Sequence, residues 1–285
     1  MKIQTFGGLG FHIDGYWRYP SLSNAMVELL GSLIHGDGQP VYIDPLLELI
    51  WPNNPHRKSK SALNTLIWRL NSSLKNVSPD GEMKIFKEKD RVVLKLPLEE
   101  RTSDFASLKN TVHNWENKRL ENKIATAENI IELVQVLDGY NGDFLPSLHS
   151  DWVIIARERY RSLYIRGCQI AMQQFVEHTN YDRAISFAKK ILVENPFRES
   201  TRRQVIWLYV MNGQRARAAQ VYKETEQILK QELGVKPMLE TMALLKLIKE
   251  DTDITEFNKR SFSDLVSNIQ INRQTLFADL SLISD

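Results

Sequence analysis

The chain has 285 residues, of which 42% are hydrophobic and 25% are charged, and its formal net charge is +2. This composition excludes a disordered chain, and the length is sufficient for two domains that each have a core. Because the net charge is small, affinity for a polyanion such as DNA would have to come from local clusters of cations.

The first hundred residues combine strand and helix patterns. "KIQTFGG" and "GFHIDG" alternate apolar and polar residues around glycines, which predicts short strands and a turn. "SLSNAMVELLGSLIHG" has apolar residues at helical spacing and a stop at Gly36. "PVYIDPLLELIWP" predicts a short strand and then a helix, with Asp44 as its N-cap and Pro45 at its first helical position.

A third helix and a hairpin complete this half of the chain. The third helix is expected in "HRKSKSALNTLIWRLNSSLK", from His56 to Lys75, and the hairpin in "MKIFKEKDRVVLKLP", with its turn around "KEKD". The order of strands, three helices and a hairpin is that of a winged helix-turn-helix domain with an N-terminal sheet. On order alone, a generic small α+β domain fits as well.

The third helix has two different faces. On a helical wheel, Leu63, Ile67, Leu70 and Leu74 form a narrow stripe that we expect to be buried. The opposite half carries polar, cationic and aromatic side chains, and no acidic residue occurs between Arg57 and Lys75. Such a face suits the major groove of DNA. A basic face that is merely solvated is the alternative.

Each residue type on this face has a role that DNA binding would use. The Arg69 guanidinium can bond guanine bidentately, and the hydroxyls of Ser61, Thr65 and Ser72 can bond phosphates or bases. Cations at the start of the helix would neutralise phosphates, together with the positive end of the helix dipole. The predicted DNA-binding residues are Arg57, Lys58, Lys60, Ser61, Asn64, Thr65, Trp68, Arg69, Ser72, Lys87, Lys89 and Arg91.

Trp68 and the hairpin cations each have a second interpretation. For Trp68 we expect packing within the protein rather than contact with DNA sugars. Lys87, Lys89 and Arg91 would reach an adjacent groove from the hairpin tip. They alternate with acidic residues, so protection of a sheet edge remains equally open for them.

From about Ser103 to Lys249 the pattern is helical. The pair Arg183-Ala184 recurs as Arg217-Ala218, 34 residues later, and this is the period of tetratricopeptide repeats. Repeat-like helical hairpins are therefore predicted, and an irregular helical domain is the alternative. In the tail from Asp251, Phe262, Leu265, Val266 and Ile269 have helical spacing. The tail could pack on the helical domain or bind a partner.

Catalytic and metal-binding patterns are absent from the sequence. "GGLG" lacks the spacing of a dinucleotide-binding loop, no phosphate-binding P-loop occurs, and the six histidines show no metal-ligand spacing. We therefore expect neither an enzyme nor a cofactor. Cys168, the one cysteine, excludes an intramolecular disulfide and is expected in the core. The chain start lacks a secretory signal and no apolar run could span a bilayer, so a cytoplasmic protein is expected.

Both halves resemble one known family. "FGGLGFHIDG", "QPVYIDPLLELIWP" and "ALNTLIWRLNSSLK" resemble the OmpR-type winged-helix domain of the Streptomyces antibiotic regulatory protein family. "ENPFRESTRRQVIWLYVMNGQRARAAQVYKETEQILKQELGVKP" resembles the bacterial transcriptional activator domain of that family, with its P-x-x-E at Pro196 to Glu199 and its ELGVxP at Glu232 to Pro237. The resemblance covers about Met1 to Lys249.

The resemblance implies a transcriptional activator that binds direct repeats in promoter DNA head to tail and contacts RNA polymerase, including its sigma factor. Arg69 matches the family's recognition-helix arginine, whereas Asn71 stands where a second arginine is common. Arg91-Val92 replaces the usual Gly-Tyr before the last strand. An ATPase domain, as in the long members, or a receiver domain with its phosphoacceptor is not expected.

The expected fold is an α+β winged helix-turn-helix followed by an all-α, tetratricopeptide-like domain. The expected domains are 1–100, which binds DNA, 101–250, which is the activator domain, and 251–285, a helical tail. The other hypothesis for the function is a protein-interaction adaptor, built on the helical repeats, whose winged helix no longer binds DNA.

Overall fold

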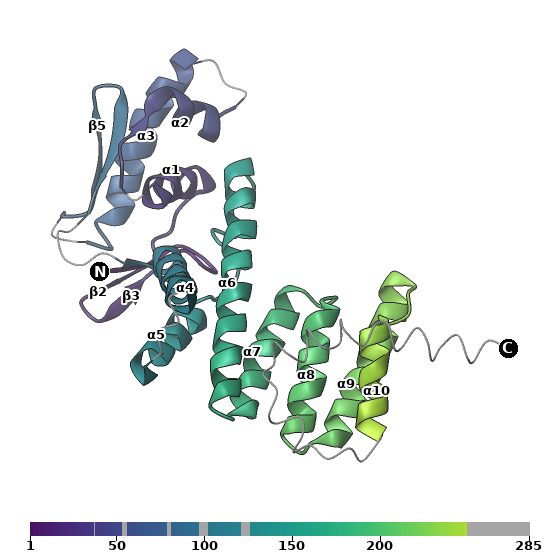
Figure 1. Ribbon diagram of the computed structural model, residues 1–285. Coiled ribbons are helices and arrows are strands. Elements are labelled where there is room, and N and C mark those ends of the chain that lie inside the picture. Colours follow the sequence, from purple (N-terminus) through teal and green to yellow (C-terminus); the bar gives the residue numbers. More distant parts are fainter. Residues whose placement is uncertain (37, 53–55, 79–80, 97–101, 121–125, 250–285) are drawn as a thin grey trace. The chain divides into compact units, whose positions relative to one another are not determined.

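The computed structural model describes residues 1–36, 38–52, 56–78, 81–96, 102–120 and 126–249, and Figure 1 shows their elements. The chain divides into two compact units, Met1–Ile170 and Ala171–Asp285. We describe each unit by itself.

A four-stranded sheet contains the N-terminus of the first unit. Its strands are β1 (Lys2–Gln4), β2 (Gly10–Ile13), β3 (Tyr16–Arg18) and β7 (Thr102–Ser103), in the order β3-β2-β1-β7. The predicted strands β1 and β2 pair antiparallel, and β7 pairs parallel to β1. The strands β3 and β7 have only three and two residues. The sequence patterns did not predict these two strands.

Three helices and a smaller sheet follow the first strands. They are α1 (Asn24–His35), β4 (Val41–Tyr42), α2 (Ile43–Ile50), α3 (His56–Leu74), β5 (Lys84–Glu88) and β6 (Arg91–Lys95). The small sheet has the order β4-β6-β5, and β5 and β6 pair antiparallel from Lys84↔Lys95 to Glu88↔Arg91. The predicted hairpin is therefore confirmed, with a two-residue turn at Lys89 and Asp90.

The predicted N-cap of the second helix is wrong. The N-cap of α2 is Tyr42, and Asp44 lies inside the first turn. Pro45 is tolerated there because the first four N–H groups of a helix have no partner within it. The Asp44 carboxylate instead faces α3, where it pairs with a lysine.

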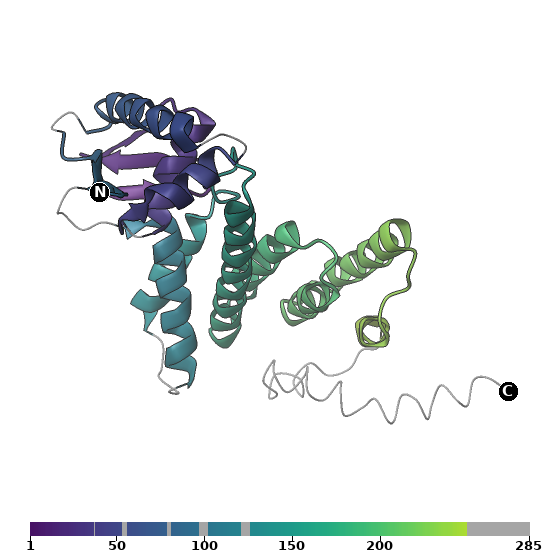
Figure 2. The ribbon, with the colours of Figure 1, turned by 90° about the horizontal axis from the view of Figure 1, so that it is seen from above.

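Three further helices belong to the first unit: α4 (Asp104–Leu120), α5 (Ala127–Asp138) and most of α6 (Asp151–Glu177). Figures 1 and 2 show α4 and α6 side by side. The helices approach closely at Gly167 of α6, where an added Cβ would lie 2.7 Å from Leu137 Cδ2 and 3.0 Å from Val112 Cγ2. Cys168, beside this contact, is fully buried, as expected.

The N-terminal strands and α4 are joined by one carboxylate. Asp104 Oδ2 accepts hydrogen bonds from the backbone N–H groups of Thr5, at 2.6 Å, and Phe6, at 2.8 Å, and Oδ1 accepts one from the Thr5 hydroxyl. Nearby, Leu145 N–H donates to the Thr5 carbonyl at 2.9 Å. Residues from beyond position 100 therefore complete the backbone bonding of the first strand.

The core of the first unit also crosses position 100. The Phe6 ring is buried against Tyr140, Phe144 and Tyr160, with centroid distances of 4.7, 6.4 and 5.7 Å. Glu28 of α1 accepts hydrogen bonds from Ser150 Oγ and the indole N–H of Trp152. Phe6 and Glu28 therefore contact α6 and the segment before it, beyond the predicted domain boundary at residue 100.

The second unit is helical. It contains the end of α6, then α7 (Tyr181–Glu194), α8 (Glu199–Met211), α9 (Arg215–Ile228), the π-helical turn η1 (Leu229–Leu233) and α10 (Leu239–Lys249). Helix α8 packs against α7 and α9, and α10 contacts α8 and α9. Ala184 and Ala218, the residues of the 34-residue repeat, are both fully buried, in α7 and α9.

The two short motifs of the second half contact each other. Glu199, the last residue of P-x-x-E, accepts a hydrogen bond from the N–H of Met238 at 2.6 Å. Met238 directly follows the ELGVxP motif, in which Gly234 has a φ of +68° that favours glycine. The motifs therefore fix the connection from η1 to α10 against the start of α8. Of the helices described, none is long and apolar enough to cross a membrane.

Candidate nucleic-acid interface

The faces of α3 are as the sequence predicts. The stripe of Leu63, Ile67, Leu70 and Leu74 is buried, together with Leu66. The residues predicted to bind DNA from this helix, as far as their side chains are described, are all exposed: Lys60, Ser61, Asn64, Thr65, Trp68, Arg69 and Ser72. The helix thus presents a polar and cationic surface about 16 Å long, from Ser61 to Ser72.

Trp68 does not pack within the protein as we expected. Its side chain is 69% exposed, so the indole does not pack on the hairpin or on the N-terminal sheet. The reason is its position on the helix, since the buried stripe lies on the opposite side and its neighbours on the exposed face are polar. Its exposure leaves contact with DNA as the open alternative.

The hydroxyls on this face lie along the helix. Ser72 Oγ donates to the Trp68 carbonyl at 3.0 Å, and Thr65 Oγ1 lies 3.5 Å from the Ser61 carbonyl. Side chains bonded in this way project little from the helix. The large side chains that project from the same surface are therefore Trp68 and Arg69.

Of the cations at the start of α3, Lys60 forms an ion pair within the protein. Lys60 Nζ lies 3.6 Å from Asp44 Oδ1, and the two side chains are 58% and 66% exposed. An exposed pair of this kind contributes at most about 1 kcal/mol, so a phosphate could replace Asp44. Arg57 and Lys58 lie in the first turn of α3, and their side chains are outside the described part of the protein.

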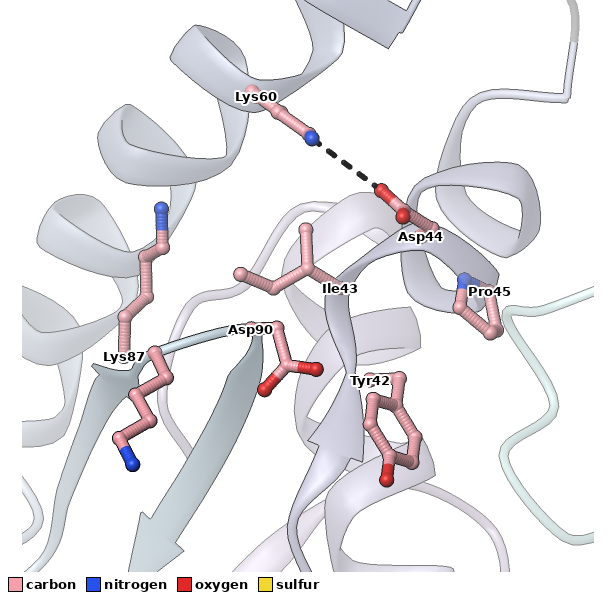
Figure 3. A pocket seen from close by; sticks show the side chains of 8 residues that line it. Tyr42, Ile43, Asp44, Pro45, Lys60, Lys87 and Asp90 are labelled. Carbon is pink, nitrogen blue, oxygen red and sulfur yellow. Dashed lines mark ion pairs between the residues drawn. The ribbon is translucent and has the colours of Figure 1, made fainter.

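A shallow pocket of about 440 Å³ lies between α2, α3 and the hairpin. Figure 3 shows the ion pair of Lys60 and Asp44 across it. Its lining residues are Tyr42, Ile43, Asp44, Pro45, Lys60, Lys87, Lys89 and Asp90. Three lysines, two aspartates and the N-terminal end of α2 thus surround one opening, and the lining has a formal charge of +1.

The hairpin cations do not all point outwards. Lys87 Nζ donates to Asn64 Oδ1 of α3 at 3.2 Å, and Lys89 lies at the turn with a φ of +54°. Arg91, by contrast, stacks over the Tyr42 ring, with its guanidinium carbon 4.4 Å from the centroid. Lys87 and Lys89 are therefore placed beside α3, whereas Arg91 is held by its cation–π contact.

Asn71 has a structural role that the sequence did not reveal. Its Nδ2 donates to the Ile85 carbonyl at 2.7 Å, and its Oδ1 accepts from the Ile85 N–H at 2.8 Å. The amide thus bonds both outward-facing peptide groups of Ile85 on β5, an edge strand. Because its amide is bonded to Ile85, Asn71 does not provide the base contact that an arginine at this position could make.

The described part of the first unit has several features of a binding surface. Among the described residues, no three His, Cys, Asp or Glu side chains gather as a metal site would require. What the first unit brings together is an exposed, acid-free helix face, a three-lysine pocket beside it, and a hairpin that contacts the same helix.

Comparison with known proteins identifies the family. Residues 103–249 match the family model described as the bacterial transcriptional activator domain. The chain is 22% identical over 212 residues to regulatory protein AfsR of Streptomyces coelicolor, and 23% identical over 230 residues to regulatory protein AfsR of Streptomyces griseus. These alignments cover 73% and 79% of this chain but only 20% and 22% of the relatives, so the chain spans about a fifth of their length.

A solved structure has a similar fold. Mycobacterium tuberculosis EmbR, in complex with a low-affinity phosphopeptide, aligns with a TM-score of 0.63 and 19% identity, over 95% of this chain and 70% of that one. The family match covers more than half of the chain, and the resemblance seen in the sequence is confirmed. The chain therefore belongs to the bacterial transcriptional activator domain family, in agreement with its resemblance to the Streptomyces antibiotic regulatory proteins.

Proposed function

We propose that the protein is a sequence-specific DNA-binding activator of transcription. The observation that carries this proposal is the exposed face of α3, which bears Arg69 and flanking cations and has no acidic residue from Arg57 to Lys75. A soluble helix face normally mixes charges of both signs, and a face of one sign fits a polyanion. A protein that binds promoter DNA would act in the cytoplasm.

The first unit would bind DNA as a winged helix-turn-helix. Helix α3 enters the major groove, where Arg69 bonds guanine and the hydroxyls meet phosphates or bases. Phosphates next to the groove are neutralised by Lys60, Lys87 and Lys89, whose side chains line the pocket. Figure 3 shows Lys60 and Lys87. The β5–β6 hairpin serves as the wing.

The second unit would contact RNA polymerase. We assign α7 to α10 to tetratricopeptide-like hairpins, because Ala184 and Ala218, 34 residues apart, are buried at matching places in α7 and α9. We keep 1–100 as the DNA-binding domain, 101–250 as the activator domain that contacts the sigma factor region, and 251–285 as a tail. The tail lies outside the described residues. Helices α4, α5 and most of α6 belong to the first unit but lie within the predicted activator domain, so they would connect DNA binding to activation.

Fluorescence anisotropy on labelled DNA tests the proposal. We expect the full chain to bind a duplex from its own upstream region more tightly than a scrambled duplex of equal composition. The logarithm of the affinity should fall linearly with the logarithm of the salt concentration, by about 0.9 for each phosphate contact. Equal and weak affinity for both duplexes at low salt would contradict the proposal.

One observation favours the adaptor as a second candidate. Large apolar side chains are exposed near η1 and α10 in the second unit, namely Leu233, Val235, Met238, Leu239 and Met242. Exposed apolar residues this close in sequence suit a protein contact. An activator would also need such a surface to contact RNA polymerase, so the surface does not distinguish the two candidates. Whether the protein binds DNA does distinguish them, and the anisotropy experiment measures that binding.

A further inference from the structure

The exposed face of α3 has an aromatic side chain near its centre. With about 100° per residue, Ser61, Thr65, Trp68 and Ser72 fall within about 60° of one another, opposite the buried stripe. Arg69 lies about 60° from the centre of this face, towards one rim. If α3 enters the major groove by this face, the indole of Trp68 enters with it, and the guanidinium approaches from the side.

The surroundings of Trp68 do not resemble a protein-binding patch. Its neighbours on the face are Ser61, Thr65 and Ser72, and all of them are small and polar. The centre of a protein interface is instead apolar over a contiguous area. A single apolar ring among hydroxyls and cations fits a partner that is mostly polar and anionic but has an isolated apolar group.

The major groove of DNA offers such a group. Of the base edges exposed there, thymine alone carries an apolar substituent, the C5-methyl, and apolar side chains contact it. The hydroxyls beside the indole lie along the helix, with Ser72 Oγ bonded to the Trp68 carbonyl at 3.0 Å. These hydroxyls therefore project less than the indole of Trp68, which can reach a thymine methyl group in the groove.

We propose that Trp68 is a specificity-determining residue that contacts the C5-methyl group of a thymine in each half-site. This inference rests on the proposed function, and it adds a second base contact to that of Arg69. Because the two residues are adjacent on one helix, the thymine lies within about two base pairs of the guanine bonded by Arg69.

Replacement of thymine by uracil isolates the methyl group. The preferred half-site is first selected with the full chain from a pool of randomised duplexes, and each thymine is then replaced singly by deoxyuridine. Uracil keeps every hydrogen-bonding group and lacks only the methyl. We expect one position at which the replacement weakens binding by the parent protein about fourfold, which corresponds to one buried methyl group.

Variants assign the effect to the indole. Trp68→Ala should bind the thymine duplex more weakly and should not distinguish it from the uracil duplex. Trp17→Ala is the matched control, because Trp17 is a 46% exposed tryptophan on β3 and not on α3, and this variant should keep the fourfold difference. Since Trp68 is a surface residue, its variant should retain the melting temperature of the parent.

The outcomes separate this inference from the proposed function. The methyl contact is refuted if the parent selects a sequence but binds every uracil duplex as tightly as the thymine duplex. It is also refuted if Trp68→Ala still binds the thymine duplex more tightly than the uracil duplex. In both cases DNA binding stands. If the selection yields no preferred sequence and binding is weak, the proposed function fails, and this inference fails with it.

Discussion

Asn71 and Trp68 both lie on α3, and they differ in how much of their surroundings the helical pattern could predict. The buried stripe from Leu63 to Leu74 could be predicted, because burial follows the period of the helix. The exposure of Trp68 follows from its place opposite that stripe. The bonds of Asn71 to Ile85 depend instead on which segment packs beside the helix. Sequence spacing along one helix does not contain that information.

Asn71 should matter for stability and not for the base preference. We expect Asn71→Ala to lower the free energy of unfolding by about 1–3 kcal/mol, because both peptide groups of Ile85 lose their partner at the edge of β5. Urea denaturation measures the change. Ser72→Ala is the control, since its hydroxyl bonds only its own helix, and it should remain within about 0.5 kcal/mol of the parent. Equal stability of the two variants would contradict this role for Asn71.

Arg69 and Lys60 should affect DNA binding in different ways. Arg69→Ala should weaken binding to the preferred site by about 1–3 kcal/mol and relax the preference at one base pair. Lys60→Ala should weaken binding to all sequences about equally and reduce the salt slope by about one. Anisotropy titrations with the preferred site and its single-base variants compare the two. If both variants bind as the parent does, α3 is not the helix that contacts the bases.

At the scale of elements, the junction of the first hundred residues with α4 and α6 was the part that sequence patterns missed. The strand β7 has two residues, and the bonds of Asp104 to Thr5 and Phe6 join groups almost a hundred residues apart. Neither leaves a periodic signal. The change from strand to helix patterns near Ser103 was real, and it coincides with the start of the family match, but packing continues across it.

His35 at this junction should make stability depend on pH. It ends α1, and its ring lies 5.4 to 6.0 Å from those of Phe105, Phe144, Trp152 and Tyr160. Burial lowers the pKa of His35, and the positive charges of Arg159 and Lys109 lower it further. The unfolded chain therefore takes up a proton near pH 6.5, whereas the folded protein does so only at lower pH. The neutral His35 side chain therefore contributes to the free energy of unfolding at neutral pH, and this contribution is lost as the pH falls below about 6.5.

A comparison with His35→Phe isolates this contribution. Urea midpoints measured at pH 7.5 and 5.5 should fall more in the parent than in the variant, because the ring of phenylalanine cannot be protonated. The other titrating groups are the same in both proteins, so they cancel in the difference. The same loss in both would show that His35 is not responsible for the pH dependence.

At the scale of the whole molecule, the proposed division of function near residue 100 differs from the division into packed units at Ile170. We expect residues 1–100 alone to lack a cooperative unfolding transition, because Phe6 loses Tyr140, Phe144 and Tyr160. Residues 1–178, which contain α4 to α6 complete, should fold and bind DNA but fail to activate a reporter gene. Circular dichroism, anisotropy and a reporter assay test the three statements. Cooperative folding of 1–100 would contradict the shared core, and full activation by 1–178 would contradict the assignment of polymerase contacts to the second unit.

The geometry of the operator follows from how few bases one unit can contact. One bidentate arginine provides about 1–3 kcal/mol and one methyl contact about 0.8 kcal/mol, together less than the roughly 4–10 kcal/mol by which specific sites exceed bulk DNA. Two protomers on adjacent half-sites could reach that range. The sequence contains no heptad seam for a symmetric coiled-coil dimer, and the resemblance implies head-to-tail binding.

We therefore expect two protomers on a direct repeat whose half-sites are centred about 10–10.5 base pairs apart. Both α3 helices then enter the major groove from the same side of the duplex. Insertion of about half a helical turn between the half-sites would rotate one of them to the opposite side, so cooperative binding should be lost, while insertion of a full turn keeps the two sides aligned. Footprinting on these spacer variants measures the effect. Protection of an inverted repeat, or cooperativity that survives the half-turn insertion, would refute the head-to-tail arrangement, because a rigid pair of adjacent protomers cannot follow the rotated site.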